Sequence, residues 1–235
     1  MNAGPLLFLA TFFAMSVSWL SFVLVPQLQL GRQPQVTTMD NAQYPPMQPG
    51  MARQGEAVYR ANGCFYCHTE QVRPRGYGSD VARSWGGRPG DVQSVNEDYL
   101  FEQTVMLGTQ RVGPDLANIG ERQTNATVLL AHIYNPQLTF SKSVMPSYRY
   151  LFERRTLKPG QARAADALPL GNAIGADEEV VPKEEARQLA AYLLNLRATQ
   201  IIFETPPPPT NAAAGSTNAP KIVAATNSPA TNSAK

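Results

Sequence analysis

Cysteine and histidine are scarce in this chain of 235 residues, which has two of each. Both cysteines lie in one pentapeptide, residues 64–68 (CFYCH), so none is left for a disulfide to a distant segment. Strongly biased charge is also absent: the formal net charge is +2 at pH 7, which gives no argument for nucleic-acid binding. Chemistry-bearing residues are therefore concentrated at one place in the sequence.

The spacing C-x-x-C-H is typical of covalent attachment of a c-type haem. Two thiols three residues apart can each add to one vinyl group, and His68 is then held where its imidazole can ligate the iron. A thioredoxin-like redox pair is an alternative, although no βαβ pattern surrounds it. A Cys₂His₂ zinc site of Cys64, Cys67, His68 and His132 is another, but the neighbours Cys67 and His68 cannot easily face one tetrahedral ion. We predict one haem c bound to Cys64 and Cys67.

Residues 5–25 (PLLFLATFFAMSVSWLSFVLV) carry no charge. As a helix they would be about 31 Å long, roughly the thickness of the hydrocarbon core of a bilayer. No Lys or Arg precedes the run and no A-x-A follows it, so an uncleaved anchor is favoured over a cleaved signal peptide. Arg32 alone would weakly favour the opposite orientation. Because c-type haem is attached on the outer face of a bacterial membrane, we expect residue 1 in the cytoplasm and the haem domain in the periplasm.

Composition divides the chain into four segments: an anchor (1–31), a Pro/Gln-rich extended linker (32–51), a cytochrome domain (52–203) and a Pro/Ala/Asn-rich tail (204–235). The domain holds most of the charged and aromatic residues. The tail has too little apolar surface to offset the entropy of ordering it, so we expect it to be disordered.

Periodicity within the domain is helical and strand signals are scarce. Helices are expected over about 54–62, 97–107 and 126–134, and a last one from Pro182, with 157–181 as an extended loop before it. The fold class is therefore mainly α: one transmembrane helix, then a class I-like cytochrome c domain of short helices around one covalent haem.

The second axial ligand has three candidates, His132, Met106 and Met145. Met106 falls inside an expected helix, where it is more simply a core residue. Met145 lies in a loop and is followed by proline, so it can lean over the porphyrin; a thioether ligand raises the reduction potential and indicates electron transfer. Pro114, in Gly-Pro-Asp-Leu, has a carbonyl that can accept a hydrogen bond from Nδ1–H of His68 and orient the ring.

Four arginines are candidates for pairing with the haem propionates, since guanidinium matches carboxylate geometry. They are Arg73, Arg75, Arg111 and Arg122. Most arginines are solvated, and we expect one or two of these to bind propionate. His132 has two open interpretations, a propionate or subunit contact and a histidine satisfied within the core.

Four segments together resemble the mono-haem subunit of cbb3-type cytochrome c oxidases, CcoO or FixO. They are GCFYCHTEQVRP (63–74), GTQRVGPDLANIGER (108–122), HIYNP (132–136) and VMPSY (144–148). The resemblance implies that Cys64 and Cys67 bind haem c and that His68 and Met145 ligate its iron. It further implies a membrane-anchored subunit that passes electrons from a c-type cytochrome, soluble or a further subunit, to a haem–copper catalytic subunit. That partner reduces oxygen to water and pumps protons.

Two other functions stay open: the similar mono-haem subunit of a nitric oxide reductase, and a free membrane-tethered electron carrier. The QVRP, GPDLANIG and HIYNP segments favour the oxidase subunit. The chain itself has no histidine cluster for a copper centre, so no oxygen-reducing site is expected on it. The loop at 157–181 and the tail depart from the family pattern.

Overall fold

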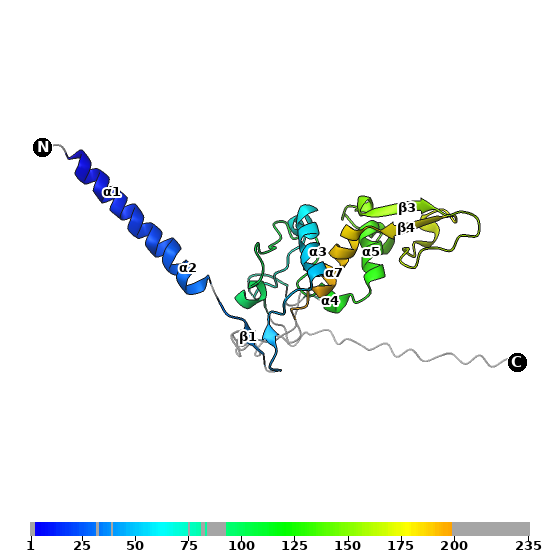
Figure 1. Cartoon of the computed structure of the whole chain (residues 1–235), viewed down its shortest axis with the longest axis horizontal. Helices are drawn as coiled ribbons and strands as arrows, with labels where there is room; N and C mark the ends of the chain where they lie inside the picture. Colours follow the sequence, from blue (N-terminus) through cyan, green and yellow to red (C-terminus); the bar gives the residue numbers. More distant parts are fainter. Residues whose placement is uncertain are drawn as a thin grey trace. The chain divides into compact units, whose positions relative to one another are not determined.

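The computed structural model describes residues 3–31, 33–38, 40–74, 76–80, 83 and 93–198, and the secondary structure within them is mostly helical (Figure 1). The tail predicted to be disordered, 204–235, lies outside the described residues. In chain order the elements are α1 (Gly4–Trp19), η1 (Leu20–Leu24), α2 (Val25–Leu30), β1 (Val36–Thr37), β2 (Gln43–Tyr44), α3 (Gly50–Ala61), η2 (Cys64–Tyr66), η3 (Asn96–Tyr99), α4 (Ile119–Arg122), α5 (Ala126–Tyr134), α6 (Pro136–Thr139), η4 (Arg149–Leu151), β3 (Phe152–Thr156), η5 (Gly171–Ala173), β4 (Glu178–Pro182) and α7 (Glu184–Asn195).

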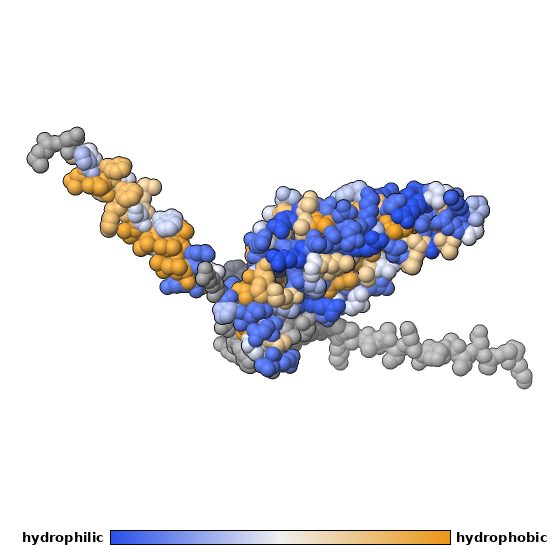
Figure 2. Space-filling model, viewed as in Figure 1, coloured by the Kyte–Doolittle hydropathy of each residue, from blue (hydrophilic) through white to orange (hydrophobic). Residues whose placement is uncertain are grey.

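The N-terminal apolar run forms one helix, Gly4–Leu30, of 27 residues, in which an 18-residue window has a mean hydropathy of 2.0. Its side chains are exposed and apolar (Figure 2), so by length and composition it can cross a membrane. Near its end, η1 is a π-helical turn in which Val25 N–H bonds to the carbonyl of Leu20. Pro26 follows and has no N–H to donate, which accounts for the interrupted α-helical ladder there.

The segment predicted as an extended linker contains a short antiparallel hairpin, in which β1 pairs with β2. Tyr44, at the end of this hairpin, is buried, and its hydroxyl donates a 2.6 Å hydrogen bond to Asp98. Gln35 also donates a side-chain hydrogen bond to the carbonyl of Pro45, at 2.8 Å. This hairpin was not predicted, because its two strands are only two residues long and show no periodicity. It holds the chain against the domain before α3 begins.

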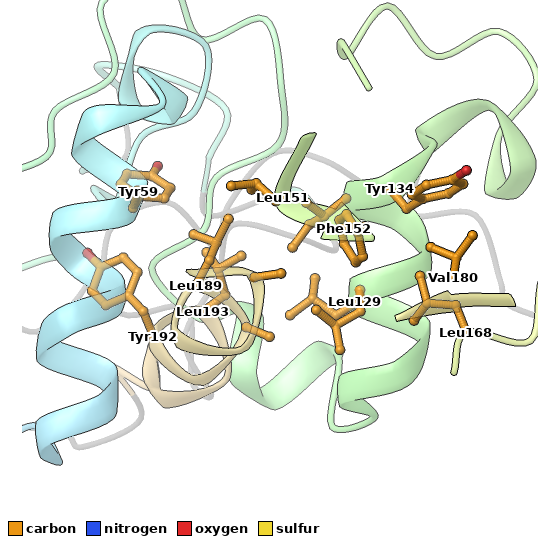
Figure 3. Packing of buried hydrophobic residues seen from close by; sticks show 14 of the residues in the cluster. Tyr59, Leu129, Tyr134, Leu151, Phe152, Leu168, Val180, Leu189, Tyr192 and Leu193 are labelled. Carbon is orange, nitrogen blue, oxygen red and sulfur yellow. The ribbon is translucent and has the colours of Figure 1, made fainter. Parts of the chain in front are cut away.

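The domain core lies between α3, α5 and α7, with the β3–β4 hairpin at its edge (Figure 3). On the predicted apolar face of the last helix, Ala186, Leu189, Ala190 and Leu193 are buried and Leu194 is partly buried. The α5 helix has the predicted bounds; the Asn125 side chain caps it by accepting from Thr127 N–H at 2.9 Å. Across α3 and α7, the rings of Tyr59 and Tyr192 pack 5.4 Å apart.

Gly55 allows α3 and α7 to cross at close range, because a Cβ there would lie only 1.9 Å from the carbonyl oxygen of Gln188. We predict that Gly55→Ala lowers the free energy of unfolding by about 1–3 kcal/mol, the usual cost of overpacking, by separating the two helices. Gly50→Ala, in the first turn of the same helix, is the matched control because its Cβ would meet nothing within 4 Å. Urea unfolding measures both. Equal stability of the two variants would contradict the tight crossing.

Strands were under-predicted. β3 and β4 form an antiparallel hairpin in which Phe152 pairs with Pro182 and Thr156 pairs with Glu178. Pro182, expected to start the last helix, is instead the final residue of β4, and α7 begins at Glu184. The expected loop is also not merely a surface loop: Leu168, Leu170 and Ile174 are buried in the core. These apolar residues lack any regular period, which is why the sequence pattern did not reveal their packing.

The helix predicted over 97–107 is wrong. Only η3, a single 3₁₀ turn, forms there, and Asp98 caps it by accepting from the N–H of Val95 at 3.0 Å. Further on, the Met106 carbonyl accepts from the N–H of Glu70, at 3.1 Å. The N–H of Leu107 donates to the carbonyl of Val105, two residues back, where an α-helix would bond it to Gln103, so tertiary structure overrides the local periodicity here.

Candidate haem-binding site

The C-x-x-C-H segment forms one tight turn directly after α3. Gly63 has a φ of +69°, a left-handed conformation that glycine adopts at low cost, and the chain there turns from α3 into η2. The N–H groups of Cys67 and His68 both donate to the carbonyl of Cys64, at 3.2 and 3.0 Å. Both cysteines are half-buried free thiols. The turn therefore presents two thiols and an imidazole together.

The Gly113–Pro114 loop contacts the His68 ring on its Nδ1 side. Its Nδ1 lies 2.8 Å from the carbonyl oxygen of Pro114, the contact that the sequence analysis expected. Gly113 packs on the ring, because a Cβ there would lie 2.2 Å from Cε1 of His68. With Nδ1 occupied, Nε2 is the nitrogen left for a metal. Burial lowers the pKa of His68, which favours the neutral imidazole that ligates iron.

Met145 lies half-buried in the segment between α6 and η4. This segment is anchored by Tyr148, whose N–H donates to the carbonyl of Ile133 in α5 at 3.0 Å. The Tyr148 side chain lies close enough to Cys64 for each group to shift the pKa of the other, although burial is the largest cause for both. Three residues from Met145, the loop thus lies close to the C-x-x-C-H turn. Met106, by contrast, is a core residue with 2% of its surface exposed.

His132 is half-buried in the last turn of α5. Burial lowers its pKa, and electrostatic repulsion from His68 lowers it further. The two histidines are therefore close enough to interact electrostatically. No hydrogen bond of the His132 ring is present among the described contacts, so its interpretation as a satisfied core histidine gains no support.

The arginine candidates have partners that the sequence analysis missed. Arg73 and Arg111 both bind the carboxylate of Asp80, at 2.8 and 2.7 Å, and the pKa of Asp80 is held well below its usual range by these bonds, that of Arg73 first. Arg122 donates to the backbone carbonyl of Asp115 at 2.5 Å. Arg75 lies outside the described residues.

Beside the His68–Pro114 contact lies a cavity of about 570 Å³. Its lining combines charged groups with an apolar side that includes Pro114 and the exposed ring of Phe140. The residues that line it are Thr69, Arg73, Asp80, Arg83, Arg111, Val112, Gly113, Pro114 and Phe140. Cationic and apolar residues both line this cavity, whereas Cys64, Cys67, His68 and Met145 do not.

A buried polar network lies behind the turn and was not foreseen. Glu70 is buried, and both of its carboxylate oxygens accept from the Tyr192 hydroxyl, at 2.9 and 2.8 Å. Burial raises the pKa of Glu70 well above its usual value, and the nearby Glu102 raises it further. The sequence carries no signal for this pair, because 122 residues separate its members.

Glu102 gives a testable pH dependence. Burial, then repulsion from Glu56, raises its pKa from 4.5 to about 7. The folded state therefore binds a proton more tightly than the unfolded state, and this contribution to stability is present below pH 4.5 and lost as the pH rises through 7. We predict that Glu102→Gln flattens the fall in unfolding free energy over this range, by on the order of 3 kcal/mol. Glu121→Gln, at an exposed carboxyl, should leave the slope unchanged, and equal slopes in wild type and Glu102→Gln would contradict the assignment.

The residues present fit a c-type haem. The turn supplies two thiols and an oriented imidazole, and the Met145 loop lies close to that turn at Tyr148. The four residues of the zinc alternative do not form such a centre: within the part of the chain that the structure describes, no three His, Cys, Asp or Glu side chains are gathered as metal ligands.

A comparison with curated proteins found no match. The model of one protein family, described as "Cytochrome C oxidase, mono-heme subunit/FixO", matches residues 3–196. The match spans the N-terminal helix, the C-x-x-C-H turn, the Pro114 loop and the Met145 segment, and so covers more than half of the chain. The chain belongs to the FixO family of mono-haem cytochrome c oxidase subunits.

Proposed function

We propose that this chain is the electron-relay subunit of a cbb3-type oxidase, taking single electrons from a c-type cytochrome and passing them to a b-type haem of the catalytic subunit. The family supplies the coarse assignment, a mono-haem subunit of a membrane-bound oxidase. The observation that carries the finer proposal is the His68–Pro114 contact beside the two thiols of Cys64 and Cys67. Bound haem would supply an iron that alternates between ferrous and ferric states.

Each residue of this site has a separate proposed role. Cys64 and Cys67 would hold the porphyrin covalently through thioethers. His68 would ligate the iron through Nε2, its ring fixed at Nδ1 by the carbonyl of Pro114. Met145 would supply a second protein ligand to the iron, and the bound haem would then serve electron transfer and not oxygen binding.

Arg73 and Arg122 are the proposed partners of the propionates. Arg73 lines the cavity next to Pro114 although it already pairs with Asp80. Arg122 is partly buried and is fixed to the backbone of the same loop. A guanidinium has five N–H donors, and Arg73 uses two of them for Asp80, so it has donors left for a second carboxylate.

The N-terminal helix is proposed to anchor the subunit, with residue 1 in the cytoplasm and the haem domain in the periplasm. The support is the apolar helix Gly4–Leu30 and the family's place in a membrane-bound oxidase. Covalent haem attachment outside the cytoplasm argues for this orientation. The proposed partners in the membrane and periplasm are the catalytic subunit and a c-type cytochrome donor.

Oxygen uptake by the detergent-solubilised complex that copurifies with the chain tests the function. With a reduced one-electron donor, we expect cyanide-sensitive oxygen consumption. An intact, haem-containing complex that consumes no oxygen would overturn the oxidase assignment. Nitric oxide consumption by that preparation would point to a nitric oxide reductase, and a haem protein without copurifying subunits would point to a free carrier.

A further inference from the structure

Asp115 is a completely buried carboxyl group, with 0% of its surface exposed, one residue beyond Pro114. Each of its oxygens accepts a hydrogen bond from a backbone N–H. Oδ2 accepts from Gln71 at 3.0 Å, and Oδ1 accepts from Ala117 at 2.9 Å. Burial disfavours a charged carboxylate, and the two amide donors offset part of that cost.

The bond to Gln71 joins two segments that are far apart in the sequence. Gln71 lies three residues after His68, and Asp115 follows the proline whose carbonyl meets the histidine ring. Backbone bonds run along the same junction: Gly113 N–H donates to Cys67 at 3.0 Å, and Leu116 N–H donates to Thr69 at 2.8 Å. Asp115 is the side chain that closes this ladder at the end away from the thiols.

Arg122 secures the same residue from its other side. Its guanidinium donates to the backbone carbonyl of Asp115 at 2.5 Å, so both the side chain and the backbone of Asp115 are held. Asp115 thereby fixes the peptide that follows Pro114. The position of the Pro114 carbonyl relative to Nδ1 of His68 depends on that peptide.

We propose that Asp115 is a positioning residue for the axial imidazole: by clamping the Pro114 loop to the segment after His68, it sets the strength of the His68–Pro114 hydrogen bond and, through it, the reduction potential. This inference rests on the proposed function, since it assumes that His68 ligates a haem iron. A stronger bond at Nδ1 makes the imidazole a better electron donor to the iron, which stabilises the ferric state.

Asp115→Asn removes the clamp with little change in volume. An amide has one acceptor oxygen, so it can keep the Ala117 bond, but its NH₂ group would then face the N–H of Gln71, donor against donor. We expect the variant to bind haem. In the reduced, detergent-solubilised full-length chain, the His68 Nδ1–H resonance should move upfield and exchange faster with water, and the midpoint potential should rise.

Glu179→Gln is the matched control. Glu179 is also buried, with 3% exposed, and accepts from a backbone N–H, that of Ala164 at 2.7 Å, but it belongs to β4. It should change neither the resonance nor the potential. A folded Asp115→Asn chain with both readouts unchanged would overturn the proposal. A raised potential with an unmoved resonance would also overturn it, because loss of charge alone would then explain the result.

One measurement needs no variant and covers the case in which Asp115→Asn fails to fold. In the wild-type haem-containing chain, the amides of Gln71 and Ala117 should resist hydrogen exchange as strongly as that of Leu116. Rapid exchange of both would show that the clamp is absent. A chain without haem fails the proposed function instead, and the haem content of the wild type distinguishes that failure.

Discussion

Replacing both Cys64 and Cys67 with alanine is expected to give a chain without covalently bound haem. These are the chain's only thiols, and they lie on one turn whose backbone is closed by bonds to the Cys64 carbonyl. Each thioether needs one of them, so the double variant has no attachment point. Denaturing electrophoresis followed by haem staining would show the loss directly, and the copurifying complex should lose oxygen uptake driven by a c-type donor.

Tyr66→Phe is the control for this experiment. Tyr66 lies between the two cysteines with 55% of its surface exposed, so the substitution leaves the turn intact. It should stain for haem as the wild type does. Haem that stays on the double-alanine chain through denaturation would contradict the attachment site. A wild-type chain that contains zinc and no haem, with the zinc lost in the double variant, would favour the zinc-site alternative.

Met145→Ala is expected to keep the haem attached and to lower its midpoint potential. Thioether ligation favours the ferrous state relative to the ligands that would replace it, such as water or a second histidine. Axial ligands set haem reduction potentials over a range of about 0.8 V, and we expect loss of the Met145 thioether to lower the midpoint potential by on the order of 0.1 V. A redox titration followed in the visible spectrum measures it.

Met106→Leu is the matched methionine control. Met106 is a core residue with 2% exposed, and a swap of similar volume should cost less than about 1.5 kcal/mol of stability and leave the potential unchanged. An unchanged potential in Met145→Ala would mean that Met145 is not the ligand. His132, the remaining candidate, would then be tested by His132→Ala in the same titration.

The elements nearest the site were the most predictable from sequence. The α5 helix was predicted with its bounds, and the His68–Pro114 contact followed from the known geometry of the two groups. For α5 the determining information is local, an apolar period with an Asn cap, whereas the His68–Pro114 contact joins residues 46 apart and was predicted from the chemistry of the two groups. The α7 helix was also predicted, with its buried face, although it starts two residues late because Pro182 ends a strand.

Contacts between distant segments were the ones missed. Met106 bonds with Glu70 in place of helix formation, and Tyr44 reaches across to Asp98. The carboxylate of Asp80 forms salt bridges with both Arg73 and Arg111, so two candidate propionate partners are already paired with an acidic side chain. Such pairs are energetically strong only after the chain is folded, and a single sequence has no period or spacing that records them.

Rapid mixing of the fully reduced complex with oxygen tests the central claim most directly. The absorbance of the haem c on this chain should fall as it is oxidised, and with excess c-type donor it should be reduced again, both at rates no slower than oxygen turnover. A haem c that stays reduced while the complex consumes oxygen at full rate would contradict the account, because electrons would then reach the catalytic subunit without passing through this chain.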